Sequence, residues 1–153
     1  MELETRSIGR CGEPTLASAY DLLLAVWRNG CRGREIGLHL MFLAWYLLCE
    51  PRHITGFDES ESGASALTDI FREVHECFRP FIRSDAEMLY VVGLMTHQFP
   101  YHLGDESELT QLSQEYRTLY RSLAPEWIRP DIFSKRGAYG DYFAGQSQVI
   151  GGY

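Results

Sequence analysis

The sequence predicts an all-α protein, built as an irregular bundle of about five helices with an irregular C-terminal segment. Three observations support this fold class. Apolar residues recur at helical spacing in several segments, residues that favour helix N-caps precede those segments, and short polar joints separate them. The chain of 153 residues contains no repeat or linker that divides it, so we expect a single helical domain over residues 1–153.

The first two expected helices lie on either side of a glycine turn. The first should begin near Thr15, because threonine is a favoured N-cap, and end at Gly30, which can supply the left-handed C-terminal cap. The second should cover Arg34–Cys49 and stop before Pro51. Apolar residues lie on all sides of this second helix, which predicts that it is the most buried element.

The run Ile36–Leu48 within the second helix is almost continuously apolar and raises the question of a membrane span. It is much shorter than the roughly 20 residues that a bilayer requires, and it contains His39. A buried helix explains the run better, so we expect no membrane association. The first ten residues lack the apolar core of a signal peptide, and a cytoplasmic location is expected.

Three more helices are expected in the rest of the chain. A third should start near Ser65 after a polar loop and end at Pro80. The sequence Ser84-Asp85-Ala86-Glu87 forms a capping box that opens a fourth helix, although its run Met88–Val92 could also be a strand. Asp105-Glu106-Ser107-Glu108 repeats the capping pattern ahead of a fifth helix, which has leucines and tyrosines on one face.

The chain after the fifth helix is expected to be mainly irregular. Two prolines frame a short segment that contains Trp127, and the last 20 residues hold five glycines and three tyrosines, with at most one short helix near Asp141–Gly145. Tyr139 and Tyr142 stand among these glycines, and tyrosine is favoured at binding surfaces. These two tyrosines are candidate partner-binding residues, unless the segment folds back into a groove between helices.

The charge distribution favours a basic protein partner. The net charge is −7, and residues 35–128 carry fifteen acidic and six basic side chains. Such a field repels phosphate backbones, so nucleic-acid binding is not expected, whereas it speeds encounter with a basic protein. Two acidic clusters are candidate contacts for that partner, although acids in loops and first helical turns also have structural roles: Asp58, Glu59 and Glu61, and Asp105, Glu106 and Glu108.

No pattern in the sequence indicates a catalytic, cofactor or metal site. The four cysteines include no closely spaced pair, so they are expected to be reduced thiols rather than zinc ligands. Glu50 and His53 match a di-iron motif once, but Pro51 breaks the helix that would aim both side chains together. His97 and His102 flank an aromatic turn, and a small helical enzyme with a pocket near these histidines is an alternative hypothesis.

Two segments resemble the immunity proteins that are encoded beside bacterial polymorphic toxins, including those of the Rhs type. The first runs from LMFLAWYLLCEP into HITGFDE, and the second is RPDIFSKRGAYGDYF. The resemblance implies a stoichiometric inhibitor, which binds the catalytic domain of a toxin and blocks access to its active site. The fold and the contact residues differ among such proteins, so no residue role is carried over to this chain.

The sequence therefore leads to one expected function and two alternatives. We expect an immunity-type binding protein that is not an enzyme, needs no cofactor and pairs with a basic toxin domain. A deep pocket with perturbed pKa values would instead favour the enzyme. An exposed apolar surface on Ile36–Leu48 would favour a third hypothesis, a structural subunit of a larger assembly.

Overall fold

The computed structural model describes residues 15–57 and 61–149, which form eight α-helices and one 3-10 helix and contain no strand. The all-α prediction is confirmed, whereas the expected number of helices was too low. The elements are α1 (Leu16–Arg28), α2 (Arg34–Cys49), α3 (Arg52–Thr55), α4 (Glu61–Ile82), α5 (Ala86–Gln98), α6 (Pro100–Leu103), α7 (Glu106–Leu123), η2 (Pro130–Phe133) and α8 (Gly137–Ser147). The sequence did not predict the short α3, α6 and η2 or the full extent of α8.

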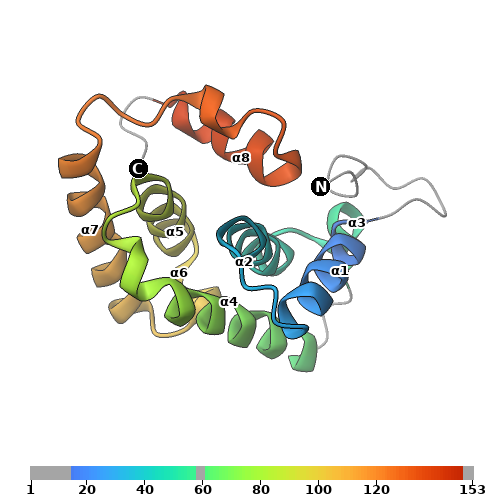
Figure 1. Cartoon of the computed structure of the whole chain (residues 1–153). Helices are drawn as coiled ribbons and strands as arrows, with labels where there is room; N and C mark the ends of the chain where they lie inside the picture. The colour runs from blue at the N-terminus through green and yellow to red at the C-terminus, as the bar shows by residue number, and fades with distance from the viewer. Residues whose placement is uncertain (1–14, 58–60, 150–153) are drawn as a thin grey trace.

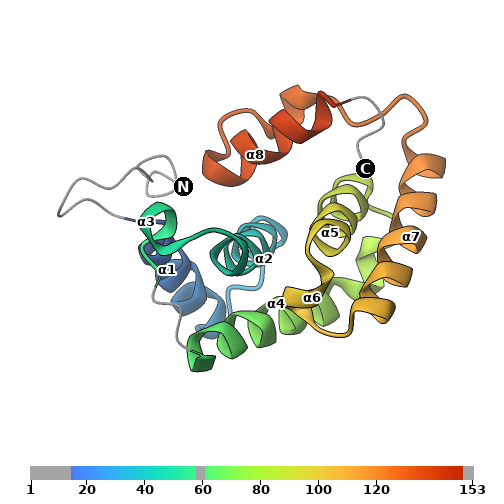
Figure 2. The same ribbon diagram turned by 180° about the vertical axis from the view of Figure 1, so that it is seen from behind.

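Two helices, α2 and α5, occupy the middle of the bundle, and the others surround them (Figure 1). Helix α1 lies against α2 on one side, α7 lies against α5 on the other, and α4 runs beneath both central helices. Helix α8 lies across the opposite side of the bundle, as the view from behind also shows (Figure 2). Every outer helix therefore buries one stripe, whereas α2 and α5 bury almost all of their surface.

The prediction that α2 is the central buried helix is confirmed, with its bounds at Arg34 and Cys49. Ten of its residues are buried, including His39. Helix α4 crosses α2 at Gly37, where a Cβ atom would lie 1.9 Å from Cε2 of Phe78. The apolar residues of α2 therefore pack in the hydrophobic core. Among the described residues, no helix combines the length and apolarity that crossing a bilayer requires.

The segment Met88–Val92 lies in a helix, which settles the choice left open by its sequence. All residues from Met88 to Thr96 are buried, so this part of α5 has no polar face. The helical period in hydrophobicity disappears when every side of a helix is covered. Apolar sequence alone cannot then distinguish a buried helix from a buried strand.

Local capping chemistry sets several helix ends. Thr15 accepts a hydrogen bond from the Ser18 N–H, and Gly30 has φ of +91°, so both predicted ends of α1 are confirmed. Asp105 caps α7 as predicted, because its carboxylate accepts the Glu108 N–H at 2.9 Å. The predicted capping box of α5 is wrong in one residue, because Asp85 rather than Ser84 accepts the Met88 N–H.

Helix α4 extends past the proline that was predicted to end it. Pro80 lies inside the helix, which continues to Ile82. Proline disrupts a helix mainly by removing one hydrogen bond and crowding the preceding turn. Ile82 is fully buried, and its packing offsets that cost over the single remaining turn.

The C-terminal segment was predicted to be irregular, and this prediction is wrong. Residues Gly137–Ser147 form α8, which starts well before the short helix expected near Asp141–Gly145. Its glycines allow close packing: a Cβ on Gly140 would lie 2.2 Å from the backbone oxygen of Phe133 in η2. Glycine content lowered the expected helicity here, but the tertiary contact requires glycine within the helix.

Candidate functional site

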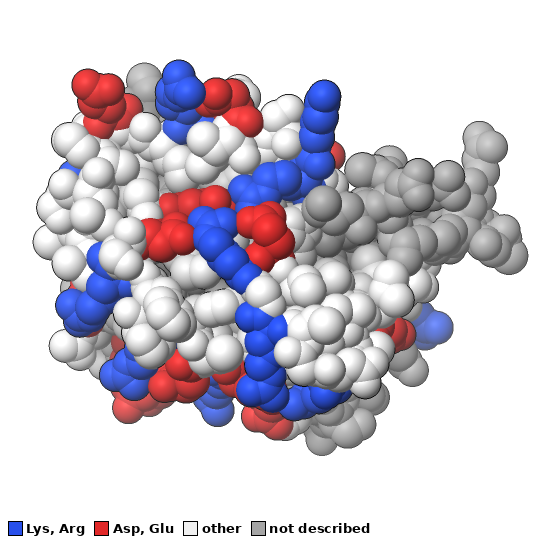
Figure 3. Space-filling view, viewed as in Figure 1, with Lys and Arg blue, Asp and Glu red and all other residues white. Residues whose placement is uncertain are grey.

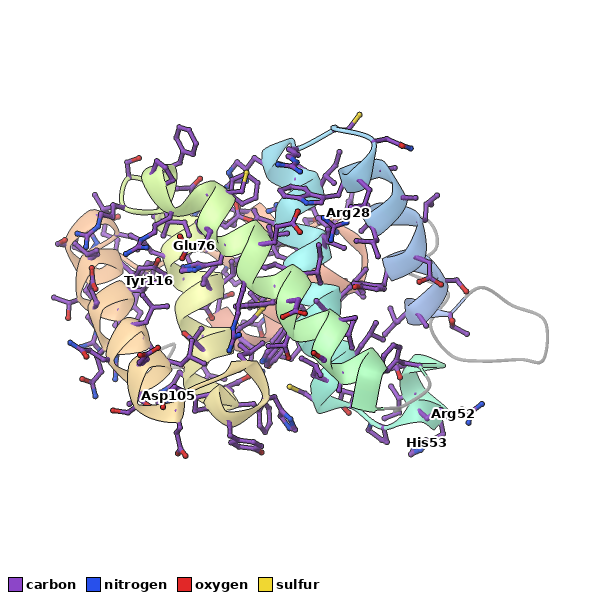
Figure 4. The ribbon with its side chains drawn as sticks, turned by 90° about the horizontal axis from the view of Figure 1, so that it is seen from below. Arg28, Arg52, His53, Glu76, Asp105 and Tyr116 are labelled. Carbon is purple, nitrogen blue, oxygen red and sulfur yellow. The ribbon has the colours of Figure 1, made fainter. Side chains whose placement is uncertain are left out.

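The outer face of α7 carries the acidic cluster that was predicted before the fifth helix. Asp105, Glu106 and Glu108 are all exposed, and we call these three residues the acidic face. Figure 4 shows Asp105 at the start of α7, at the periphery of the molecule. A shallow hollow of about 620 Å³ lies beside this face, lined by acidic and neutral polar side chains: Asp105, Glu106, Ser107, Thr110, Gln111 and Gln114.

All three residues of the acidic face stabilise the start of α7, but Glu106 and Glu108 have no paired cation in the described part of the chain. Asp105 caps the helix, and Glu106 and Glu108 lie in its first turn, where negative charge complements the helix dipole. No ion pair joins Glu106 or Glu108 to another described residue. The two carboxylates and the hollow, which is itself lined in part by Asp105 and Glu106, therefore face the solvent. This is a suitable surface for Arg or Lys side chains.

The other end of α7 carries exposed apolar side chains. Trp127 is 44% exposed, Leu123 is 48% exposed and Ile132 is 39% exposed. The Arg121 guanidinium lies 5.8 Å from the centre of the Trp127 ring, within the range of a cation–π contact. We call residues 123–132 the anchor loop. The sequence analysis did not assign this loop a role, although the prolines that frame Trp127 indicated a constrained turn.

Two hydrogen bonds hold the anchor loop. The Trp127 N–H donates to the Ala124 carbonyl at 3.0 Å and closes a turn that contains Pro125. The Ile128 N–H donates to the hydroxyl of Tyr120 at 2.7 Å. Because Tyr120 is buried in α7, its hydroxyl attaches the loop to the core. Burial raises the pKa of Tyr120, so this hydroxyl stays protonated well beyond neutral pH.

The remaining predicted partner-binding residues divide into two groups. Asp58 and Glu59 lie outside the described residues, as does the side chain of Glu61, the first residue of α4. Tyr139 has no exposed surface, so its assignment to a partner surface is corrected. Tyr142 is partly buried and its hydroxyl donates to the Gln98 side chain at 2.6 Å. The alternative, in which this segment fills a groove between helices, is confirmed.

A network of ion pairs joins the beginnings of α2, α5 and α8. Arg34 donates to both Asp85 and Glu87 at 2.8 Å. Arg136 donates to Glu87 at 2.6 Å and to Glu35 at 2.8 Å. Figure 3 shows acidic and basic side chains interleaved near the centre of the viewed face, where α2 and α5 begin. Two arginines balance most of the charge of the three carboxylates, and the ion pairs between them hold the helices together.

The electrostatics of Asp85 follow from this network. Burial alone would raise the pKa of its carboxyl group, but hydrogen bonds from Arg34 and from the Met88 N–H outweigh burial and lower it. The same contacts raise the pKa of Arg34. Asp85 is therefore ionised throughout the neutral range and remains paired with Arg34.

The two histidines of the alternative hypothesis, His97 and His102, do not line the hollow beside the acidic face. His97 is exposed at the end of α5, and His102 stacks on Tyr101 with ring centres 4.4 Å apart. A second hollow, of about 320 Å³, is mainly apolar and contains neither histidine, since it is lined by Arg34, Phe78, Phe81, Ser84, Asp85 and Met88. Within residues 15–57 and 61–149, no three His, Cys, Asp or Glu side chains gather closely enough to hold a metal ion.

One histidine forms a buried polar pair between helices. The His75 Nε2 atom on α4 lies 2.7 Å from the hydroxyl of Tyr116 on α7. Figure 4 shows Tyr116 projecting from α7 toward α4, whose exposed side carries Glu76. Burial lowers the pKa of His75, although the neighbouring Glu76 acts in the opposite direction. This neutral pair fixes the position of α7, and thereby of the acidic face, against α4.

Known proteins offer no further guide to the site. No family model, curated protein or solved structure matches the chain.

Proposed function

We propose that this protein is an immunity-type inhibitor, which binds the catalytic domain of a bacterial toxin in equal amount and blocks its active site. The observation that carries this proposal is the acidic face of α7. Glu106 and Glu108 are exposed on a rigid helix and have no ion-pair partner among the described residues. Carboxylates held in this way attract a basic surface before contact and form charge-assisted hydrogen bonds after it.

Inhibition by occlusion makes limited demands on a protein. It requires a stable scaffold and a complementary surface, but no reactive group. Helix α7 meets the first requirement because Tyr116 and Tyr120 bury its inner side against α4 and α5. The excess of acidic over basic residues in 35–128 meets the second, since toxins that act on nucleic acids or nucleotides have basic active sites.

The burial of α2 weighs against the hypothesis of a structural subunit. That hypothesis required the apolar surface of Ile36–Leu48 to face a neighbouring molecule. Ten residues of α2 are buried within this chain, among them Leu38, Phe42 and Trp45. The apolar surface is thus already covered by the other helices.

A tagged pull-down from the native host tests the proposal, with mass spectrometry to identify the proteins that co-purify. The expected result is one basic partner in equal amount, which is toxic when expressed alone and harmless when expressed with this protein. A partner that shows no toxicity would contradict the proposal. A monomer that purifies with a bound small molecule would favour the enzyme and make His97 and His102 the first residues to replace.

A further inference from the structure

The anchor loop combines exposure with backbone strain. Among the described residues, the non-glycine residues with positive φ are Trp127, at +70°, and Lys135, at +61°. They lie on either side of η2, in the same segment as the exposed Leu123 and Ile132. A left-handed φ strains any residue that has a Cβ atom. A bulky aromatic residue held exposed in this conformation is costly to the fold and is typical of a functional site.

The loop is also preformed. The turn at Pro125 and the hydroxyl of Tyr120 hold the backbone on both sides of Trp127, while Arg121 packs against its ring. An aromatic side chain that is already ordered loses little entropy when it binds. Tryptophan is also the residue most enriched among those that dominate binding energy at protein interfaces.

The charges near Trp127 are mixed, whereas those of the acidic face are all negative. Arg121 and Lys135 are exposed beside the anchor loop, but within the loop Glu126 is exposed next to Trp127, and Asp131 pairs with Arg129. Glu106 and Glu108 lie at the other end of α7. Thirteen residues separate Glu108 from Arg121, which corresponds to about 20 Å along a helix. The helical period places Gln111, Gln114, Thr118 and Arg121 on one exposed stripe that connects the two ends. Helix α7 and the anchor loop thus present one continuous surface with an acidic end and an aromatic end that carries both signs of charge.

We infer that Trp127, supported by Leu123 and Ile132, is the anchor that enters the catalytic cleft of the toxin. The inference rests on the proposed function and specifies the chemistry of the partner. The partner has an apolar pocket at the mouth of its cleft, which receives Trp127. A basic surface beside this cleft faces Glu106 and Glu108.

The two ends of this surface contribute differently to binding. Charges at the edge of an interface mainly affect the association rate, because they act before contact. A buried aromatic anchor mainly affects the dissociation rate, because its contacts form only in the complex. The inference therefore predicts that replacement of Trp127 shortens the lifetime of the complex and leaves the association rate nearly unchanged.

The test measures the binding kinetics of the purified toxin domain with three forms of this protein: wild type, Trp127→Ala and Phe81→Ala. Phe81 is a matched control, because it is an aromatic residue with 62% exposure on α4, outside both the anchor loop and the acidic face. We expect Trp127→Ala to raise the dissociation rate about 30-fold and to change the association rate less than twofold. The control should bind like the wild type, and circular dichroism should show that both variants fold.

Tryptophan fluorescence gives an independent measurement. Trp27 and Trp45 are buried, with 0% and 1% exposure, so acrylamide should quench mainly Trp127 in the free protein. Addition of the toxin domain should protect this emission. The inference would be overturned if the Trp127→Ala variant dissociated from the toxin domain at the wild-type rate, or if binding left the quenching of Trp127 unchanged. Either result would leave the proposed function intact. If the wild type binds and inhibits no toxin domain, the inference and the proposed function fail together.

Discussion

Arg136 and Glu87 form the contact that fastens the C-terminal helix to the bundle. The Arg136 Nη1 atom donates to Oε1 of Glu87 at 2.6 Å, and their side chains are only 14% and 11% exposed. The hydroxyl of Tyr139 donates to the same Glu87 oxygen. One carboxylate on α5 thus satisfies two donors from α8, and the otherwise small contact between α8 and the central helices becomes specific.

Loss of the Glu87 charge should therefore loosen α8. Glu87→Gln leaves two arginines near a neutral amide, and we expect the free energy of unfolding to fall by about 3 kcal/mol. Urea denaturation followed by circular dichroism measures this change. Glu76→Gln is the control, because its ion pair with Arg79 is exposed and should contribute less than about 0.5 kcal/mol. Equal effects of the two substitutions would show that the Glu87 contacts do not stabilise α8.

The buried pair of His75 and Tyr116 should make stability depend on pH. Burial lowers the pKa of His75 below its ordinary 6.5, so the unfolded chain takes up a proton at a pH where the folded protein does not. The free energy of unfolding is therefore highest above about pH 6.5, where His75 is neutral in both states. It falls as the pH decreases from there toward the pKa of His75 in the folded protein. Urea denaturation at several pH values between about 7.5 and 5 measures the decline.

Two histidine variants identify the group responsible for this decline. His75→Gln retains a hydrogen-bonding partner for Tyr116 but cannot titrate, so its stability should decline less over the same range. His53→Gln, at an exposed position on α3, should decline like the wild type. A decline that persists in full in His75→Gln would assign the pH dependence to another group.

Two glycine-to-alanine substitutions in helices should change stability in opposite directions. Alanine at Gly37 places its Cβ 1.9 Å from the Phe78 ring, so either this buried ring or the helix crossing must shift. We expect a loss of about 2 kcal/mol despite the better helix propensity of alanine. Alanine at Gly145 in α8 meets no atom within 4 Å, and we expect a gain of about 0.5 kcal/mol. Thermal denaturation compares both variants with the wild type, and a stabilised Gly37→Ala protein would contradict the close crossing.

Charge reversal on the acidic face should slow association with the toxin domain. The double variant Glu106→Lys/Glu108→Lys leaves the Asp105 cap intact, and we expect the association rate to fall about tenfold at low salt. The difference should shrink as salt is added, because ions screen the exposed charges. Stopped-flow fluorescence at two salt concentrations measures both effects.

A control of equal charge separates local from global electrostatics. Asp21→Lys/Asp141→Lys changes the net charge by the same amount at two exposed acids on α1 and α8. Its association rate should fall much less than that of the variant in the acidic face. Equal slowing by both variants would mean that the total charge, rather than the acidic face, steers the encounter.

Sequence reasoning worked best where structure depends on neighbouring residues. The caps at Thr15 and Asp105 follow from hydrogen bonds that span three residues, and both were predicted. The acidic face could be named as a cluster for the same reason, because its residues lie close together in the chain. The anchor loop was missed, since exposure and the left-handed φ of Trp127 depend on the hydroxyl of Tyr120 and the course of the chain around it.

The sequence by itself determined the helical class, the ends of α1 and α2 and the burial of α2, because periodicity and capping act within a few residues of the chain. Only the tertiary structure decided that the C-terminal segment forms a helix and buries Tyr139. Tyr139 became a core residue through Glu87, which lies 52 positions earlier, and Arg136 reached Glu35 across 101 positions. Contacts at such separations arise only when the helices pack, and no local pattern encodes them.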